Sequence, residues 1–335
     1  MEKTYELLLG PGTDGIPNPP YTASHLIRHA DCQYWTVAEG CIFEQCFDGR
    51  YAYLYYYEYW LDRSTDIPVQ INKGDLHLLY TLLSDGEIHV VAQSLQTNLH
   101  TQSGEGAYYY LSQGTYNLRI PPGHHILIGF ILDAGLFRPP ANKSFTFLDS
   151  LLKAKKDQAP HALQSKRFRA GELTTRYLKL LFKKINPYTL DNEHILLRHL
   201  IFLINLSRFK FLDHAERQND EHTLVYQARQ LLELLIIQQG AQAQLKDIAQ
   251  VLHIGVVQLR RLHRHQYGYS LQQYRNELLL DLIRSSLPEN DKLIATAIQV
   301  GFSGLSEMGR FIRTHTGLSS QQFKAQIKNK KINLP

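Results

Sequence analysis

The chain has few cysteines and lacks the segments that would direct a protein into a membrane. Its 335 residues contain Cys32, Cys41 and Cys46, an odd number crowded into one stretch. We therefore expect a reduced compartment and small buried cysteines rather than disulfides, metal ligands or redox groups. The N-terminus has neither the basic stretch nor the apolar core of a signal peptide, and apolar runs such as 126–132 and 234–237 are too short to span a bilayer. We expect a cytoplasmic protein that does not bind membranes.

Charge is distributed unevenly along the chain. Residues 1–145 contain 8 Lys and Arg against 15 Asp and Glu, residues 146–221 contain 14 against 9, and residues 222–335 contain 14 against 7. The net charges of these segments are therefore −7, +5 and +7. A basic C-terminal third indicates contact with a polyanion, although solvated helical faces are often basic as well.

The first 145 residues have the composition of a β-rich domain. Turn signals separate short segments rich in apolar and aromatic residues, at 51–57, 76–83, 87–92 and 116–120. Regular spacing of such segments predicts a sandwich or small barrel, as the first part of an α+β chain. The tyrosines between Tyr51 and Tyr59 fit strand residues with water-exposed hydroxyls, and a tyrosine-lined pocket is the alternative.

A helical pattern follows, and it predicts a linker or dimerisation region at 146–213. Segments 172–182 and 190–206 have helical periodicity, and a polar run at 214–221 separates them from the last third of the chain. The apolar faces of these helices are broader than one small bundle needs, which predicts a homodimer. Residues of such a face are Leu196, Leu197, Leu200, Ile201 and Leu203.

The last third contains an internal repeat. Residues 268–274 and 317–323 share Gly, Ser, Gln-Gln and a closing aromatic residue. Upstream of the two glycines, Ala249 and Ala297 lie 19 and 20 residues away, within matching apolar frameworks. This predicts an all-α domain at 222–331 with two helix-turn-helix units, at about 245–266 and 293–315.

The residue types at these positions have physical reasons. Ala249 or Ala297 would let the second helix of a unit cross closely over the first, and Gly255 or Gly301 would permit the turn between them. The second helix would bury one face and leave the other free to enter a major groove. That free face carries Arg260, Arg261 and Arg264 in the first unit, and Arg310 and Arg313 in the second.

Arginine is the side chain best suited to guanine edges and phosphates. The alternative is a helical interaction domain with solvated arginines. Residues 271–287 read as one connecting helix that ends before Pro288 and spans about 25 Å. Such a rod could place two recognition helices in successive major grooves.

From these residues the segment 223–328 resembles the DNA-binding domain of the AraC/XylS family, and residues 300–319 resemble the signature of its second unit. Five positions depart from the family pattern, which usually or often has Ser, Phe, Arg, Phe and Pro there: Gly255, His263, Leu279, Met308 and Ser320.

The resemblance implies a transcription regulator, an activator or a repressor, that binds promoter DNA in sequence-specific fashion. It implies that Val257, Arg260 and Arg261 of the first unit face base edges, together with Ser306, Glu307 and Arg310 of the second. Val257 could contact a thymine methyl, and Glu307 could accept a hydrogen bond from cytosine. It further implies a cupin-like N-terminal sensor or dimerisation domain, a small-molecule effector and a homodimer, and it leaves RNA polymerase open as a partner.

Two other classes of function stay open. A cupin-type enzyme or metal-binding module could be fused to the DNA-binding domain, with His124 and His125, or His77 and His89, as ligands. No His-x-His with a following Glu lies at ligand spacing, so we expect hydrogen-bonded histidines, no metal, no cofactor and no enzymatic activity. The third class is a DNA-binding scaffold without a small ligand.

Overall fold

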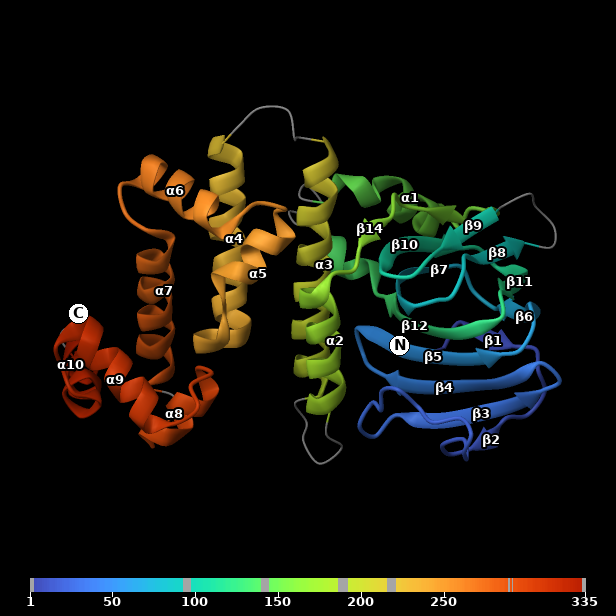
Figure 1. Ribbon diagram of the computed structural model, residues 1–335, viewed down its shortest axis with the longest axis horizontal. Coiled ribbons are helices and arrows are strands. Elements are labelled where there is room, and N and C mark those ends of the chain that lie inside the picture. Colours follow the sequence, from blue (N-terminus) through green and yellow to red (C-terminus); the bar gives the residue numbers. More distant parts are fainter. Residues whose placement is uncertain are drawn as a thin grey trace. The chain divides into compact units, whose positions relative to one another are not determined.

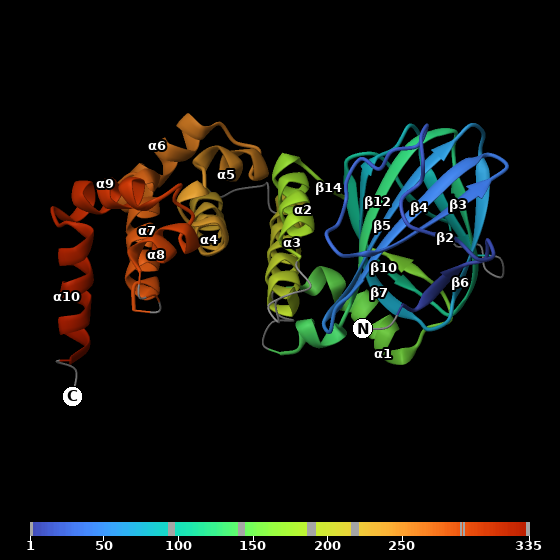
Figure 2. The same cartoon turned by 90° about the horizontal axis from the view of Figure 1, so that it is seen from below.

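The chain folds into two compact units, Met1–Phe211 and Leu212–Pro335. The computed structural model describes residues 3–92, 98–139, 145–185, 192–215, 221–288, 290 and 292–332 (Figure 1). All described strands lie in the first unit, and the second unit is helical (Figures 1 and 2). The α+β class predicted from the sequence is therefore confirmed.

The first unit contains two antiparallel sheets, which matches the predicted β-rich sandwich or barrel. The five-stranded sheet has the order β1, β6, β11, β8, β9. Its strands are β1 Tyr5–Leu7, β6 Thr65–Ile71, β8 Ile88–Ala92, β9 Asn98–Thr101 and β11 Gly114–Ile120.

The nine-stranded sheet has the order β13, β10, β7, β12, β5, β4, β3, β2, with β14 also paired to β10. Its strands are β2 Thr13–Asp14, β3 Asp31–Val37, β4 Gly40–Asp48, β5 Ala52–Leu61, β7 Asp75–Leu83, β10 Glu105–Leu111, β12 Gly123–Leu132, β13 Leu163–Gln164 and β14 Phe168–Arg169. The apolar core of the domain draws residues from both sheets.

Strand β5 is buried on both of its faces, which explains its tyrosines. Side chains alternate along a strand, so Tyr55, Tyr57 and Tyr59 point the same way and line a cavity of about 100 Å³ between the sheets. On the opposite face, the ring of Tyr56 meets that of Phe182 edge to face at 6.3 Å. The expectation of water-exposed tyrosine hydroxyls is wrong for these residues, and the pocket alternative is the observed one.

Helices of the middle region pack against the nine-stranded sheet. They are α1 Asp149–Asp157, α2 Glu172–Lys184 and α3 Asn192–Ala215, with short 3-10 turns at Ala134–Phe137 and Thr146–Leu148. The hydroxyl of Tyr108 on β10 lies 2.7 Å from that of Ser207 on α3. The phenyl rings of Phe147 and Phe211 stack at 4.2 Å.

The middle region is not helical throughout, because β13 and β14 lie between α1 and α2. Their two-residue pairings with β10 are too short to leave a periodic pattern in the sequence. The side chain of Gln164 on β13 also bonds to the backbone of the edge strand β9. Its amide N–H donates to the carbonyl oxygen of His100 at 2.9 Å, and its amide oxygen accepts from the backbone N–H of His100 at 3.3 Å. This segment therefore belongs to the β-rich domain.

The second unit is built around two long helices, α4 Glu221–Gln239 and α7 Leu271–Ser286. Helices α5 Leu245–Val251 and α6 Val256–Tyr267 precede α7, and α8 Leu293–Gln299, α9 Leu305–Thr316 and α10 Ser320–Ile332 follow it, with a 3-10 turn at Gly240–Gln242. Figure 1 shows α6 and α9 at opposite ends of α7. No described helix is long and apolar enough to cross a membrane.

Candidate nucleic-acid interface

Helices α5 and α6 form one helix-turn-helix unit, and α8 and α9 form another. In both units the small residue that the sequence singles out is buried, Ala249 on α5 and Ala297 on α8. Both second helices end at a glycine in the left-handed region, Gly268 with φ 79° and Gly317 with φ 73°. The amide of each glycine donates to a carbonyl four residues earlier at 2.9 Å, which closes the helix in the same way.

The difference of one residue between the repeats lies in the turn. Helix α5 ends at Val251 and α8 at Gln299, and the left-handed residue of the turn follows two positions later, at His253 with φ 49° and at Gly301 with φ 85°. The next helix has its N-cap at Gly255 in the first unit and at Gly304 in the second, two and three residues further on. The second turn is therefore one residue longer.

Gly255 does not permit the first turn, contrary to the sequence-based interpretation. Its φ of −66° is available to any residue, and nothing lies within 4 Å of where a side chain would begin. His253 carries the positive φ instead, a conformation in which histidine is less disfavoured than most residues. Gly301 does have the predicted role, because its φ is 85° and a Cβ would lie 2.4 Å from the carbonyl oxygen of Gln239.

The two second helices expose equivalent faces. Buried Leu259, Leu262 and His263 hold α6, and buried Met308 and Ile312 hold α9. All eight side chains named as DNA-facing are exposed: Val257, Arg260, Arg261 and Arg264 on α6, and Ser306, Glu307, Arg310 and Arg313 on α9.

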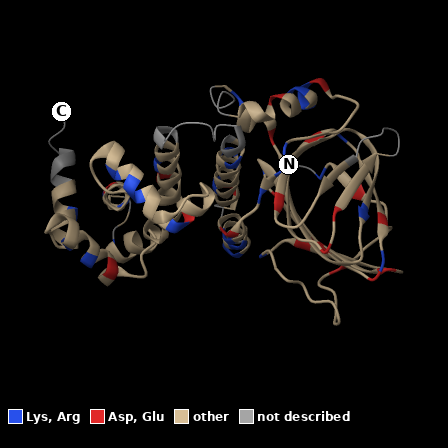
Figure 3. Ribbon diagram, turned by 45° about the horizontal axis from the view of Figure 1, so that its top comes forward, with Lys and Arg blue, Asp and Glu red and all other residues tan. Residues whose placement is uncertain are grey.

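Equivalent positions on the two helices differ by 49 in number, as the glycine caps do. Arg261 thus corresponds to Arg310, and Arg264 to Arg313. Val257 is the most exposed large apolar side chain of the described part of the chain, at 81%. Figure 3 shows basic positions in blue on these helices. Each unit therefore presents two arginines at equivalent positions, one turn apart, on a face that stays exposed in the described part of the domain.

Glu307 has a structural partner at the start of α9. Its carboxylate accepts hydrogen bonds from the N–H and the hydroxyl of Ser303, at 2.8 and 2.7 Å. These bonds, and more weakly the charge of Arg310, lower the pKa of the carboxyl group. The carboxylate therefore ties the first turn of α9 to the preceding turn, and contact of Glu307 with a base stays a prediction.

His263 is fully buried where the resembled family has an aromatic residue. Its Nδ1 lies 2.9 Å from the carbonyl oxygen of Tyr269. Its ring stacks near Tyr274, and the guanidinium of Arg229 on α4 lies 3.5 Å above that tyrosine ring. Burial lowers the pKa of His263, so the neutral imidazole packs as an aromatic ring and keeps a hydrogen bond. The first unit is thus well packed despite the substitution.

Leu279 occupies a buried position of α7, and the polar anchor lies one turn earlier. Arg275 donates to the carbonyl oxygens of Ala241 and Ala243, at 2.6 and 2.8 Å, and so ties α7 to the turn after α4. Sequence reasoning missed this anchor, although its signal is present: Arg275 precedes Leu279 by four residues and shares its helix face.

The histidines of the β-rich domain have protein partners. Nε2 of His124 lies 2.7 Å from Glu58, and Nδ1 of His125 lies 2.8 Å from the hydroxyl of Ser84. His77 and His89 belong to different sheets, on β7 and β8. Among the described residues no three His, Cys, Asp or Glu side chains are placed to hold a metal ion.

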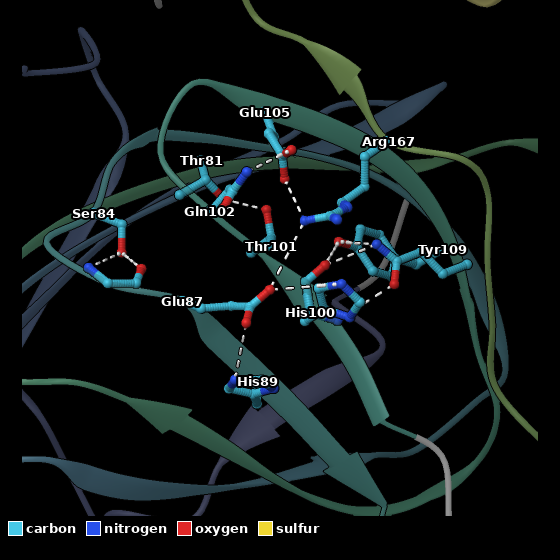
Figure 4. A network of polar contacts seen from close by, with 12 residues as sticks. Thr81, Ser84, Glu87, His89, His100, Thr101, Gln102, Glu105, Tyr109 and Arg167 are labelled. Atoms are coloured by element: carbon cyan, nitrogen blue, oxygen red, sulfur yellow. Dashed lines mark hydrogen bonds and ion pairs between the residues drawn. The ribbon is translucent and has the colours of Figure 1, made fainter.

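A polar network around Glu87 joins the two sheets (Figure 4). The Glu87 carboxylate lies 3.5 Å from His89 and 3.6 Å from His100, cross-strand neighbours on β8 and β9. Arg167 reaches Glu105 of β10 at 2.9 Å and Glu87 at 3.9 Å. These partly exposed ion pairs connect the two sheets, and their arrangement indicates no catalytic or binding site.

Comparison with known proteins identifies the second unit. Residues 248–326 match the family model of a helix-turn-helix domain. No curated protein matches the chain.

Solved structures are similar over different lengths of the chain. A single-residue variant of ToxT from Vibrio cholerae, in its apo form, is 12% identical over 84% of this chain and 99% of its own, with a TM-score of 0.32. A regulator from Chromobacterium violaceum with an AraC-type DNA-binding domain is 24% identical over 32% of this chain and 93% of its own, with a TM-score of 0.28. These scores establish no common fold for the whole chain. The family match and the paired helices agree that residues 248–326 form a helix-turn-helix domain.

Proposed function

We propose that this protein is a transcription regulator that binds duplex DNA in sequence-specific fashion through α6 and α9. The observation that carries the proposal is the duplicated helix-turn-helix, in which both second helices expose arginines at equivalent positions. Helix α7 between them has 16 residues and a length of about 24 Å, comparable with but shorter than the roughly 34 Å turn of B-DNA.

The exposed side chains have different proposed roles. Arg261 and Arg310 lie in the middle of their helices, where bidentate contact with a guanine can discriminate bases. Arg264 and Arg313 lie one turn closer to the helix ends, where phosphate contacts would position the domain. Val257 and Ser306, with Arg260, complete the surface that faces the groove, and Glu307 bonds to Ser303 of the preceding turn.

The experiment is selection from a random duplex library with the full chain, followed by titration of the selected site at several salt concentrations. We expect one enriched motif, bound with an affinity that falls linearly with salt on logarithmic axes, because phosphate contacts release counterions. A scrambled duplex is the control. Absence of an enriched motif, or binding that does not depend on salt, would contradict the proposal.

The first unit gives the regulator its sensing and assembly functions in this proposal. The cavity between its sheets would hold a small effector, and α2 and α3 would support a homodimer that binds a promoter. In vitro transcription with purified RNA polymerase, with and without the protein, distinguishes activation from repression. No enzymatic activity is part of the proposal.

A further inference from the structure

The two helix-turn-helix units follow one another along the chain, and α7 makes the covalent connection between them. Helix α7 ends at Ser286, and α8 begins at Leu293. A unit that is held by one covalent connection can turn about it. The placement of α9 relative to α6 therefore depends on a second contact between the units, and the turn that follows α4 supplies one.

The 3-10 turn Gly240–Gln242 lies directly against the turn between α8 and α9. The backbone N–H of Ala241 donates to the carbonyl oxygen of Val300 at 2.9 Å. Gly240 has a φ of 55°, and a Cβ at this position would come within 1.8 Å of the same oxygen. Gly301 approaches the end of α4 equally closely from the other turn. The two glycines allow the backbones to touch, and we call this meeting of the turns the inter-unit contact.

Arg275 attaches the first of these turns to α7. Its guanidinium donates to the carbonyl oxygens of Ala241 and Ala243, at 2.6 and 2.8 Å. The turn is thus bonded to α7 by Arg275 and to the second unit by Ala241, while the chain itself joins α7 to the second unit. These three attachments close a triangle, so the second unit cannot hinge at one of them without breaking another.

The inter-unit contact reaches both exposed helices through packed side chains. In the second unit, the N–H of Phe302 donates to the carbonyl oxygen of Ala297 at 2.9 Å, and its ring lies 5.6 Å from that of Phe311 on α9. In the first unit, the guanidinium of Arg229 on α4 lies 3.5 Å from Nε2 of His263 on α6. Helix α4 therefore links the position of α6 to that of α9.

We propose that Gly240 and Arg275 are positioning residues that fix the spacing between the two DNA half-sites read by α6 and α9. This inference rests on the proposed function and adds a spacing requirement to it. One extra base pair moves a half-site about 3.4 Å along the duplex and turns it by about 35°. A second unit that cannot hinge follows neither change, whereas a unit joined by the chain alone follows part of both.

The test measures how the full chain tolerates a change of spacing. Duplexes carry one copy of the selected site, with the two half-sites at the selected distance or one base pair nearer or further apart. Fluorescence anisotropy gives the affinity for each duplex. We expect the wild type to lose about 100-fold in affinity on either one-base-pair change, because two linked readers lose their joint binding when geometry prevents both from engaging.

Two variants open the triangle at different attachments. Gly240→Ala forces the turns apart, and Arg275→Met removes both hydrogen bonds to the turn while keeping an apolar side chain on α7. In both variants we expect the loss on a one-base-pair change to fall to about ten-fold or less. Affinity for the selected spacing should also fall, because the second unit must then be ordered on binding.

Gly268→Ala is the matched control. Gly268 has a φ of 79°, so alanine is strained there as at position 240, but nothing lies within 4 Å of where its Cβ would be. We expect this variant to lower the Tm and to keep the wild-type dependence on spacing. The dependence on spacing thus separates a positioning role from a role in stability alone.

A wild type that accepts both one-base-pair changes with little loss overturns the inference. So does retention of the full loss in both Gly240→Ala and Arg275→Met, or an equal gain of tolerance in Gly268→Ala. Each of these results leaves DNA binding by the wild type intact and contradicts this inference alone. A wild type that enriches no motif contradicts the proposed function instead.

Discussion

At the scale of single residues, the domain separates side chains that pack or bond within it from side chains that stay exposed on α6 and α9. His263 and Arg275 are engaged with other parts of the domain, and Glu307 bonds to Ser303 of the turn before α9. By contrast Arg261 and Arg310 are exposed at corresponding positions of two helices. We therefore expect Arg261 and Arg310 to determine base specificity.

Replacement of Arg310 or Arg261 by Ala should reduce specificity more than it reduces general DNA affinity. A bidentate contact with guanine is worth roughly 1–3 kcal/mol of discrimination, about 5- to 150-fold in the ratio of cognate to random binding. Titrations of the selected and a scrambled duplex measure this ratio. Arg284→Ala is the control, because Arg284 pairs with Asp281 on the connecting helix at 2.7 Å and should alter the ratio little. Equal losses on both duplexes would assign Arg310 to phosphate.

At the scale of elements, patterns that repeat over many residues could be predicted and single turns could not. Long helices such as α2 follow from periodicity, and strands such as β5 follow from an apolar and aromatic composition between turn signals. The two-residue strands β13 and β14 exist only because β10 offers them an edge, so no local signal marks them. The positive φ of the first turn falls on His253 rather than on a glycine, a choice that tertiary packing makes.

The candidate site was predictable to a similar extent. Helical spacing identified the exposed arginines correctly as exposed, because buried positions recur every three or four residues on α6 and α9. It could not show that Glu307 bonds to Ser303, which requires the bend of the turn. Nor could it place His77 against Tyr55, since 22 residues that include strand β6 separate them.

The two turns give a matched pair of substitutions. Gly301→Ala forces a left-handed conformation on alanine and a clash with the carbonyl of Gln239, so we expect a loss of stability of about 2 kcal/mol or more. Gly255→Ala should be neutral or stabilising by up to about 1 kcal/mol, since its backbone is extended and the space is open. Urea unfolding followed by helical circular dichroism measures both. A larger loss for Gly255→Ala would refute the assignment of the first turn to His253.

At the scale of the whole molecule, charge separates the functions. Net charges of −7 for residues 1–145 and +7 for residues 222–335 direct a polyanion to the helical unit and repel it from the β-rich domain.

Helix α3 leaves only a small apolar surface for dimerisation. Leu196, Leu200 and Leu203 are buried within the chain, whereas Ile201 on α3 is 41% exposed, so less apolar surface is free than the sequence suggested. We expect a homodimer of moderate affinity, because an interface of a few exposed apolar groups buries little area. Sedimentation at micromolar concentration, with and without the selected DNA site, measures the mass.

Ile201→Glu should shift the equilibrium towards monomer, since it would place a charge in the interface. Ile298→Glu changes an equally apolar residue of α8 that is 66% exposed and should leave the mass unchanged. A monomer mass in both conditions, or a dimer that Ile201→Glu does not weaken, would exclude this face of α3 as the interface.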